Sequence, residues 1–313
     1  SEQHGLERET VKPGRESVTP KMESELMVVC LAVVGRRSGS LADDVMGLVP
    51  VRKMKNEAAM KKRGRAIPAE EVAVSADGSL YRAVGSFGGF CTASFISPEG
   101  LLLTNYHCSY NAVQQHSSMT RNIVEHGFWA SQRAEELPIS GLSITLNKSI
   151  IDVSDEVNKA TATLGGGGQN LRKATEPVSQ RHSVPGLKNI IKSYKNGAIH
   201  IRYHQQVFED VRIVGVPPKQ VAKFGGETDN WMWPRHSADF AYFRVYTSPD
   251  GSPAKYSANN IPMHPDQYLN VSVDGYDRGN FAMSIGVPGY TERQATTGRG
   301  WEVRNVHNAP MEE

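Results

Sequence analysis

The strongest constraint in this sequence is a pair of cysteines that flank a predicted hairpin, the second of which directly follows a histidine. Cys91–Ser97 is apolar and rich in β-forming residues, Pro98–Gly100 has turn composition, and Leu101–Asn105 forms a second β-like segment. The second segment leads directly to His107 and Cys108. A bridge from Cys91 to Cys108 would close a loop of roughly 17 residues and stabilise the fold by about 3 kcal/mol in the chain-entropy model. The hairpin context favours this bridge.

A second interpretation of the same residues stays open. Two free thiols beside His107 would form a metal or redox cluster instead, since thiolates and imidazoles are the ligands that zinc takes in proteins. Only three cysteines occur, Cys30 being the third, so the chain is not a small disulfide scaffold. If Cys91 and Cys108 are bridged, the protein belongs in an oxidising compartment.

Length and composition predict a globular protein with a substantial core. The 313 residues, of which 39% are hydrophobic, suffice for one large domain or two ordinary ones. The net charge is only +2, and the basic run at 61–65 is short and has no recognisable binding motif around it. These features argue against a nucleic-acid partner.

Residues 1–55 form a polar, aperiodic leader in which we expect little packed structure. Its one apolar stretch, Leu26–Val34, matches a signal-peptide core in length and is too short to cross a bilayer. Glu23 and Glu25 precede it, where a signal peptide has basic residues. The stretch therefore indicates either a weak export signal or a disordered or mis-started leader, and in neither case a membrane span.

The remaining pattern predicts a mainly β protein with inserted helices. Apolar residues recur at helical spacing from Gln114 to Glu136, which predicts an amphipathic helix, and Ser154–Leu164 shows a second helical pattern. In the last third, strands are predicted over Ala238–Val245, Leu269–Val273 and Phe281–Ile285, separated by turn residues.

His200 and His204 raise a separate possibility of a zinc site. Residues four apart share one face of a helix and could hold a metal together. The apolar alternation of Ile199, Ile201 and Tyr203 indicates a strand instead. On a strand the two imidazoles lie too far apart for an easy shared geometry, so zinc is the weaker interpretation.

The segment 225–240 is dense in groups that are costly to gather without a purpose: two tryptophans, two aspartates, an arginine and a histidine. A serine peptidase of chymotrypsin type fixes its histidine base so that one ring nitrogen meets a serine and the other an aspartate. Asp229 and Asp239 are both candidates for orienting His107. We favour Asp239, because it opens a predicted strand that would hold its carboxylate rigidly.

Two strings make the chain recognisable: Leu-Leu-Leu-Thr-Asn-Tyr-His-Cys-Ser-Tyr at 101–110 and Asp-Asn-Trp-Met-Trp-Pro-Arg-His at 229–236. They resemble the bacterial dipeptidyl-peptidase 7 and dipeptidyl-peptidase 11 family. The resemblance continues in the same order through 210–218 and 286–289 and runs from about Met54 to about Thr297. The string at 229–236 is too specific to arise by chance.

The resemblance implies a chymotrypsin-like double β-barrel with an inserted helical domain, of which residues 56–313 would be an incomplete, N-terminal portion. It also implies a periplasmic or secreted enzyme that removes dipeptides from peptide N-termini, without a cofactor or a metal. His107 matches the general base and Asp239 the triad aspartate. Asn230 and Trp231 match the pair that receives the free α-amino group, since an amide oxygen accepts from an ammonium and an indole face attracts a cation. A homodimer of the full-length protein is left open.

The family's nucleophilic serine, in a Gly-Asn-Ser-Gly-Ser-Pro type segment, has no counterpart in these 313 residues. We therefore expect a truncated chain that is inactive alone, because His107 has no serine proton to take. Two alternatives stay in view: a non-catalytic peptide-binding relative, and an unrelated metal-binding or structural β protein. Tyr106 departs from the family pattern, since a second histidine usually stands there.

Overall fold

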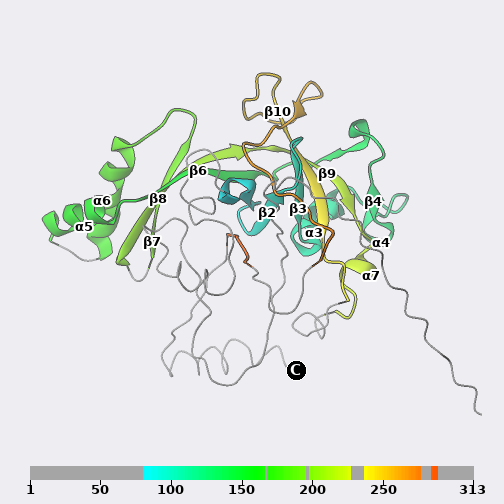
Figure 1. The fold of residues 1–313 in the computed structure, drawn as a ribbon, viewed down its shortest axis with the longest axis horizontal. Coiled ribbons are helices and arrows are strands. Elements are labelled where there is room, and N and C mark those ends of the chain that lie inside the picture. Colours follow the sequence, from blue (N-terminus) through cyan, green and yellow to red (C-terminus); the bar gives the residue numbers. More distant parts are fainter. Residues whose placement is uncertain (1–79, 166–167, 195–196, 227–235, 276–282, 288–313) are drawn as a thin grey trace, which may run out of the picture.

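A computed structural model describes residues 80–165, 168–194, 197–226, 236–275 and 283–287. Their centre is an antiparallel sheet with the strand order β4-β9-β10-β3-β2-β1-β6-β8-β7, in which β5 also pairs with β9 and β11 with β10. The short helices flank this sheet, and one end of it extends as an arm (Figure 1). The expectation of a mainly β protein with few helices is confirmed. Among the described residues, no helix has the length and apolarity needed to span a membrane.

The strands and helices have the following bounds. The strands are β1 Val84–Phe87, β2 Cys91–Phe95, β3 Leu101–Thr104, β4 Phe128–Trp129, β5 Leu137–Pro138, β6 Ile144–Asp152, β7 Lys188–Tyr194, β8 Ile199–Phe208, β9 Asp210–Val216, β10 Ala241–Thr247 and β11 Ile261–Pro262. The α-helices are α3 Tyr106–Gln115, α4 Ile123–His126, α5 Ser154–Thr163, α6 Gly168–Arg181 and α7 Lys219–Ala222, and the 3-10 helices are η1 Leu80–Ala83 and η2 Arg133–Glu135.

The main core lies between the inward faces of β1 to β3, β9 and β10. Alternate residues of β10, Ala241, Phe243 and Val245, are fully buried, as expected when one face of a strand packs inward. The Phe87 and Phe243 rings meet edge to face with centroids 4.9 Å apart. Cys108 of α3 belongs to the same buried cluster, so the helix that carries His107 is anchored in the core.

The arm consists of β6, β8 and β7 with α5 and α6 packed beside them (Figure 1). Val153, Val157 and Val178 form its small apolar core. The predicted helix at Ser154–Leu164 is confirmed as α5.

The two histidines of the arm lie on strand β8, as the alternation predicted, and bond to separate groups. His200 Nδ1 lies 2.9 Å from the hydroxyl of Ser193. His204 Nδ1 lies 2.8 Å from the hydroxyl of Ser149, and its Nε2 lies 2.8 Å from the carbonyl oxygen of His182. Within the described part of the chain, neither histidine belongs to a group of three or more metal-ligating side chains, so nothing in the structure favours the zinc interpretation.

The predicted helix from Gln114 to Glu136 is wrong. The first helical segment, α3, starts earlier, at Tyr106, and ends at Gln115; α4 covers only Ile123–His126. Gly127 has a φ of 72°, in the left-handed region, and ends α4, after which β4 pairs with β9. Ile123 is buried and Val124 and Phe128 pack against the core, but Trp129 is exposed, so the apolar periodicity came from several short elements and not from one helix.

Two of the predicted C-terminal strands also differ from the structure. Residues 269–273 have no strand conformation, although Leu269 is buried and its N–H donates to the carbonyl of Phe95. Of Phe281–Ile285, the described residues 283–285 are not in a strand. The third, Ala238–Val245, corresponds to β10, which begins at Ala241. The leader, including Leu26–Val34, and the rest of residues 1–79 lie outside the described residues.

A buried ion pair between two residues of β9 fixes the start of this strand. Arg212 donates two hydrogen bonds to the carboxylate of Asp210, at 2.9 and 2.7 Å, and its guanidinium carbon lies 3.6 Å from the ring centroid of Tyr246. Asn260 also donates to Asp210, at 2.8 Å, which ties the segment before β11 to β9. Because both charged side chains are buried, neither can be rehydrated if the other is lost.

Asp210→Asn is therefore expected to lower the free energy of unfolding by about 3 kcal/mol, since it leaves the Arg212 charge buried without its counterion. The matched control is Glu99→Gln, which breaks the solvent-exposed ion pair between Glu99 and Arg133 and should lower the free energy of unfolding far less than Asp210→Asn does. Urea unfolding followed by circular dichroism measures both. Equal losses in the two variants would contradict the assignment of a buried, uncompensated charge.

Candidate active site

The pairing of β3 with β10 brings two distant parts of the chain together. The strands are antiparallel, and Ala241 pairs with Thr104. Residues before Ala241 therefore run alongside residues after Thr104. This register places Asp239 next to the start of α3, where His107 lies, although 132 positions separate them in the sequence.

Asp239 holds His107 through both of its carboxylate oxygens. Oδ2 lies 2.7 Å from the ring Nδ1 of His107, and Oδ1 accepts a hydrogen bond of 3.0 Å from the backbone N–H of the same residue. The His107 side chain is 58% exposed, whereas that of Asp239 is 22% exposed. The carboxylate is thus partly shielded from solvent while the imidazole reaches toward solvent, as a base that must meet a substrate requires.

The backbone contact also caps a helix. The first N–H groups of a helix have no intrahelical acceptor, and Asn105, at the N-cap position of α3, makes no side-chain cap of its own. Asp239 supplies the missing acceptor at His107, and its negative charge is favourable beside the positive end of the helix dipole. The same carboxylate therefore fixes both the helix and the ring that the helix carries.

Asn105 is a site residue that the sequence analysis missed. Its side-chain amide donates to the backbone carbonyl of Asp239 at 3.1 Å and to Oδ2 at 3.3 Å. It thereby holds the aspartate backbone and carboxylate together against the start of α3. The sequence gives no signal for this role beyond an asparagine two residues before His107. Its partner, Asp239, lies 134 positions away.

Hydrogen bonding keeps Asp239 ionised. Burial raises the pKa of this carboxyl, but hydrogen bonds from the ring and backbone N–H of His107, together with that from Asn105, outweigh burial and lower the pKa below its ordinary value. With the carboxylate ionised, the proton between the two groups belongs on Nδ1 of His107. The Nε2 atom then carries the basic lone pair.

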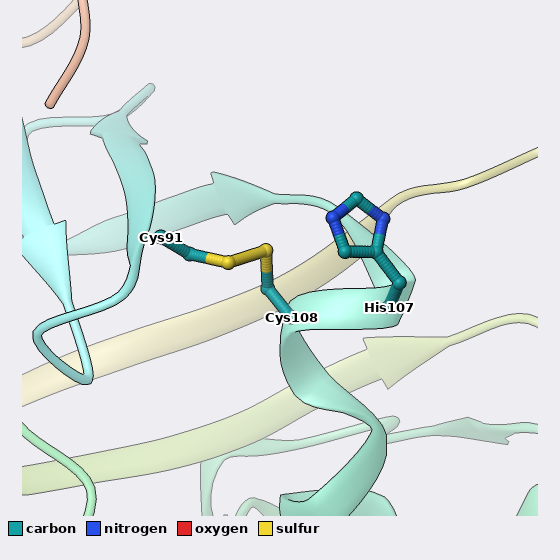
Figure 2. A group of neighbouring side chains, drawn as sticks. All are labelled: Cys91, His107 and Cys108. Atoms are coloured by element: carbon teal, nitrogen blue, oxygen red, sulfur yellow. A yellow bond between two sulfur atoms is a disulfide. The ribbon is translucent and has the colours of Figure 1, made fainter. Parts of the chain in front are cut away.

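Cys91 and Cys108 form a disulfide beside this pair, as the sequence analysis favoured (Figure 2). Their Cα atoms lie 6.1 Å apart. The bridge joins the start of β2 to the first turn of α3, which is also the turn that carries His107. In this structure the two sulfurs bond to each other, so the interpretation of Cys91 and Cys108 as free thiols is wrong.

His107 lies on a helix that follows directly after the predicted β-like segment Leu101–Asn105. His107 lies in the first turn of α3, and β3 stops at Thr104. Asn230 and Trp231, predicted to receive the substrate's amino group, lie outside the described residues, and so does Asp229. The structure thus brings together His107, Asp239 and the disulfide, and the catalytic roles of the first two stay predictions.

Comparison with known proteins identifies the family. The peptidase S46 family matches residues 42–312 of the chain. The chain belongs to the peptidase S46 family. Dipeptidyl-peptidase 7 of Phocaeicola vulgatus is 38% identical over 282 residues, which cover 87% of this chain and 38% of that protein. The Asp/Glu-specific dipeptidyl-peptidase of Porphyromonas gingivalis is 35% identical over 299 residues, covering 92% of this chain and 41% of that protein.

The solved structures agree with the family. The crystal structure of Porphyromonas endodontalis DPP11 superimposes with a TM-score of 0.72 at 36% identity, covering 81% of this chain and 38% of that one. This S46 chain therefore has the chymotrypsin-like peptidase fold of its relatives. It spans well under half the length of the curated proteins it matches.

The lowered pKa of Asp239 predicts a pH-dependent contribution to stability. A carboxyl whose pKa is lower in the folded than in the unfolded state stabilises the fold above about pH 4 and loses this effect as pH falls through the folded-state pKa. The difference in unfolding free energy between the wild type and Asp239→Asn should therefore be largest near neutral pH and shrink below about pH 4. Asn105→Ala should lower the unfolding free energy by a smaller amount, with the same dependence on pH.

Urea unfolding across a pH series measures these differences. Asp274→Asn, at an exposed aspartate, is the control for a general effect of removing a carboxylate. A difference for Asp239→Asn that stays constant into the acid range would show that its carboxylate does not gain its stabilisation from ionisation.

Proposed function

We propose that this protein represents a serine-type dipeptidyl-peptidase of the S46 family in which His107 is the general base and Asp239 orients it. The observation that carries the proposal is the 2.7 Å contact between His107 Nδ1 and Asp239 Oδ2, with the ring at the surface and the carboxylate half-buried. A dipeptidyl-peptidase removes dipeptides from the N-terminus of a peptide. Peptides with a free N-terminus are accordingly the partners proposed, and the chemistry requires no cofactor.

The geometry suits base catalysis for a physical reason. A serine hydroxyl becomes a strong nucleophile when a neighbouring imidazole takes its proton. Asp239 holds the proton on Nδ1 and so keeps Nε2 in the basic form. When Nε2 takes the serine proton, the nearby carboxylate stabilises the imidazolium that results.

The nucleophile is proposed to come from sequence beyond these 313 residues. No serine here lies in a Gly-x-Ser-Gly setting such as the family uses, and the relatives are more than twice as long as the matched part. The 313-residue polypeptide alone would then supply the base and its aspartate without the group they activate. The disulfide supports a periplasmic or secreted location, since such bridges persist in oxidising compartments.

The 313-residue chain should not react with a fluorophosphonate probe, which labels activated serines, and should not release chromophore from dipeptidyl substrates. Labelling or turnover by the purified chain would overturn the assignment of the nucleophile to another segment. A longer product containing a Gly-x-Ser-Gly segment should do both. A longer product that binds peptides without turnover would identify a non-catalytic relative instead.

In such a longer product, Asp239→Asn should lower kcat by about four orders of magnitude and His107→Ala by about six, as in other serine peptidases with this pair. His264→Ala is the matched control, because this exposed histidine bonds to the carbonyl of Pro98 in the turn between β2 and β3. Steady-state kinetics measure all three. Activity that survives His107→Ala would exclude His107 as the base.

Substrate recognition is proposed to depend on the free α-amino group, with Asn230 and Trp231 as its receivers. N-acetylation of a peptide removes the charge and should lower kcat/KM of the longer product by at least about a hundredfold, since a cation–π contact and a charged hydrogen bond are lost together. Trp231→Ala should reduce the difference in kcat/KM between free and acetylated peptides. Equal cleavage of the two peptides would contradict exopeptidase specificity.

A further inference from the structure

Three side chains with metal-binding atoms gather at the start of α3. One sulfur each from Cys91 and Cys108 and one ring nitrogen of His107 all lie within 4.8 Å of one another. Figure 2 shows the imidazole beside the two sulfurs, on the same side of the helix turn. Among the described residues, this is the one place where three or more potential metal ligands lie close together.

Contacts other than the disulfide hold these residues in place. The hydroxyl of Thr104 donates to the carbonyl of Thr92 at 2.8 Å, next to Cys91, and the N–H of His107 donates to Asp239. β2 and β3 also pair directly, with Ser94 opposite Leu103. These contacts do not depend on the sulfur–sulfur bond, so we expect β2 and the first turn of α3 to stay side by side when it is broken.

We propose that reduction of the Cys91–Cys108 bond converts this cluster into a binding site for a thiophilic divalent cation such as Zn²⁺. A dithiol breaks the bond by exchange: it gives up two electrons and two protons and becomes a disulfide itself, while Cys91 and Cys108 become thiols. When the cation binds, both thiols release their protons to solvent and coordinate as thiolates. His107 supplies the third ligand as neutral imidazole.

The dimensions fit tetrahedral coordination. Ligands bound at Zn–S and Zn–N distances of 2.0 to 2.3 Å lie about 3.5 to 3.8 Å apart, so the cluster has to contract slightly around the cation while the sulfurs separate. The Cα atoms of the two cysteines, 6.1 Å apart, allow this without moving the backbone far. Two cysteines and one histidine, with water in the fourth position, are an established zinc ligand set.

The surroundings of the cluster favour a bound cation in two further ways. A histidine that ligates a metal usually bonds to a carboxylate through its other nitrogen, which fixes the ring and raises its basicity. Asp239 already makes this bond at Nδ1 of His107, at 2.7 Å. Cys108 stands in the first turn of α3, where the positive end of the helix dipole stabilises a thiolate.

The site has a consequence for activity that rests on the proposed function. A cation bound to His107 occupies the imidazole that would take the serine proton. Reduction in the presence of zinc would then switch the peptidase off, and reoxidation would restore it. Binding of the cation itself requires neither turnover nor the missing serine, so it can be tested on the 313-residue chain independently of catalysis.

The test uses Co²⁺, which reports thiolate ligands by a charge-transfer band in the near ultraviolet and tetrahedral geometry by its visible spectrum. The chain carries Cys30→Ser, so that the third cysteine cannot contribute. It is reduced with a phosphine, which ends as the phosphine oxide with oxygen taken from water, and is then desalted. We expect one Co²⁺ per reduced chain, displaced by one Zn²⁺, and no band from the oxidised chain.

Variants assign the ligands. Cys91→Ser and Cys108→Ser should each abolish the charge-transfer band of the two-thiolate site, and His107→Ala should weaken binding by more than about tenfold. Asp239→Asn should weaken it about 10- to 100-fold through the ring it orients. His264→Ala should leave binding unchanged.

Three outcomes would overturn the proposal. One is a reduced chain that keeps its circular dichroism spectrum but gives no charge-transfer band. Another is binding that is as tight in His107→Ala as in the parent. The third is a chain that unfolds on reduction, because the argument requires the remaining contacts to hold the two sulfurs together. Each is independent of whether a longer product is a peptidase.

Discussion

The antiparallel pairing of β3 with β10 is the interaction on which the site depends. The register that sets Ala241 opposite Thr104 determines which residues meet beyond the ends of the two strands. A shift of one residue would turn the buried face of β10 outward and withdraw Asp239 from His107. The alternation of Ala241, Phe243 and Val245 into the core therefore specifies the site as well as the fold. The geometry of the candidate site is here a consequence of core packing.

Asp239 couples stability to function at one carboxylate. It caps the amino end of α3, orients the imidazole of His107 and accepts from Asn105. Each of these donors favours the ionised form, so the group that stabilises the helix is also the group that keeps Nε2 basic. The disulfide holds the same turn by joining it to β2. The turn that carries the ring is thus held both by β2 and by the residues that precede β10.

Local chemistry explains what could be predicted from sequence. The β2–β3 hairpin, the bridge between its flanking cysteines and the strand after Asp239 each follow from neighbouring residues, and all three are present. Failures came where tertiary contacts decide. The helix predicted over 114–136 included Gly127, whose left-handed conformation ends a helix at that point. Asn105 was missed because its function is visible only once Asp239 lies beside it. Roles that depend on residues 227–235 require the geometry of that segment.

The His107–Asp239 geometry is complete within a part of the relatives' length. The contacts that set it come from β3, the first turn of α3 and the residues before β10, all of them among the described residues. Orientation of the His107 ring is therefore a property of this portion of the fold, and under the proposed function a nucleophile from elsewhere would meet an imidazole that is already aligned. Such preorganisation lowers the cost of assembling the site, since the ring need not be ordered when substrate binds. It also means that the chemistry of the His107 imidazole can be measured separately from that of the proposed serine.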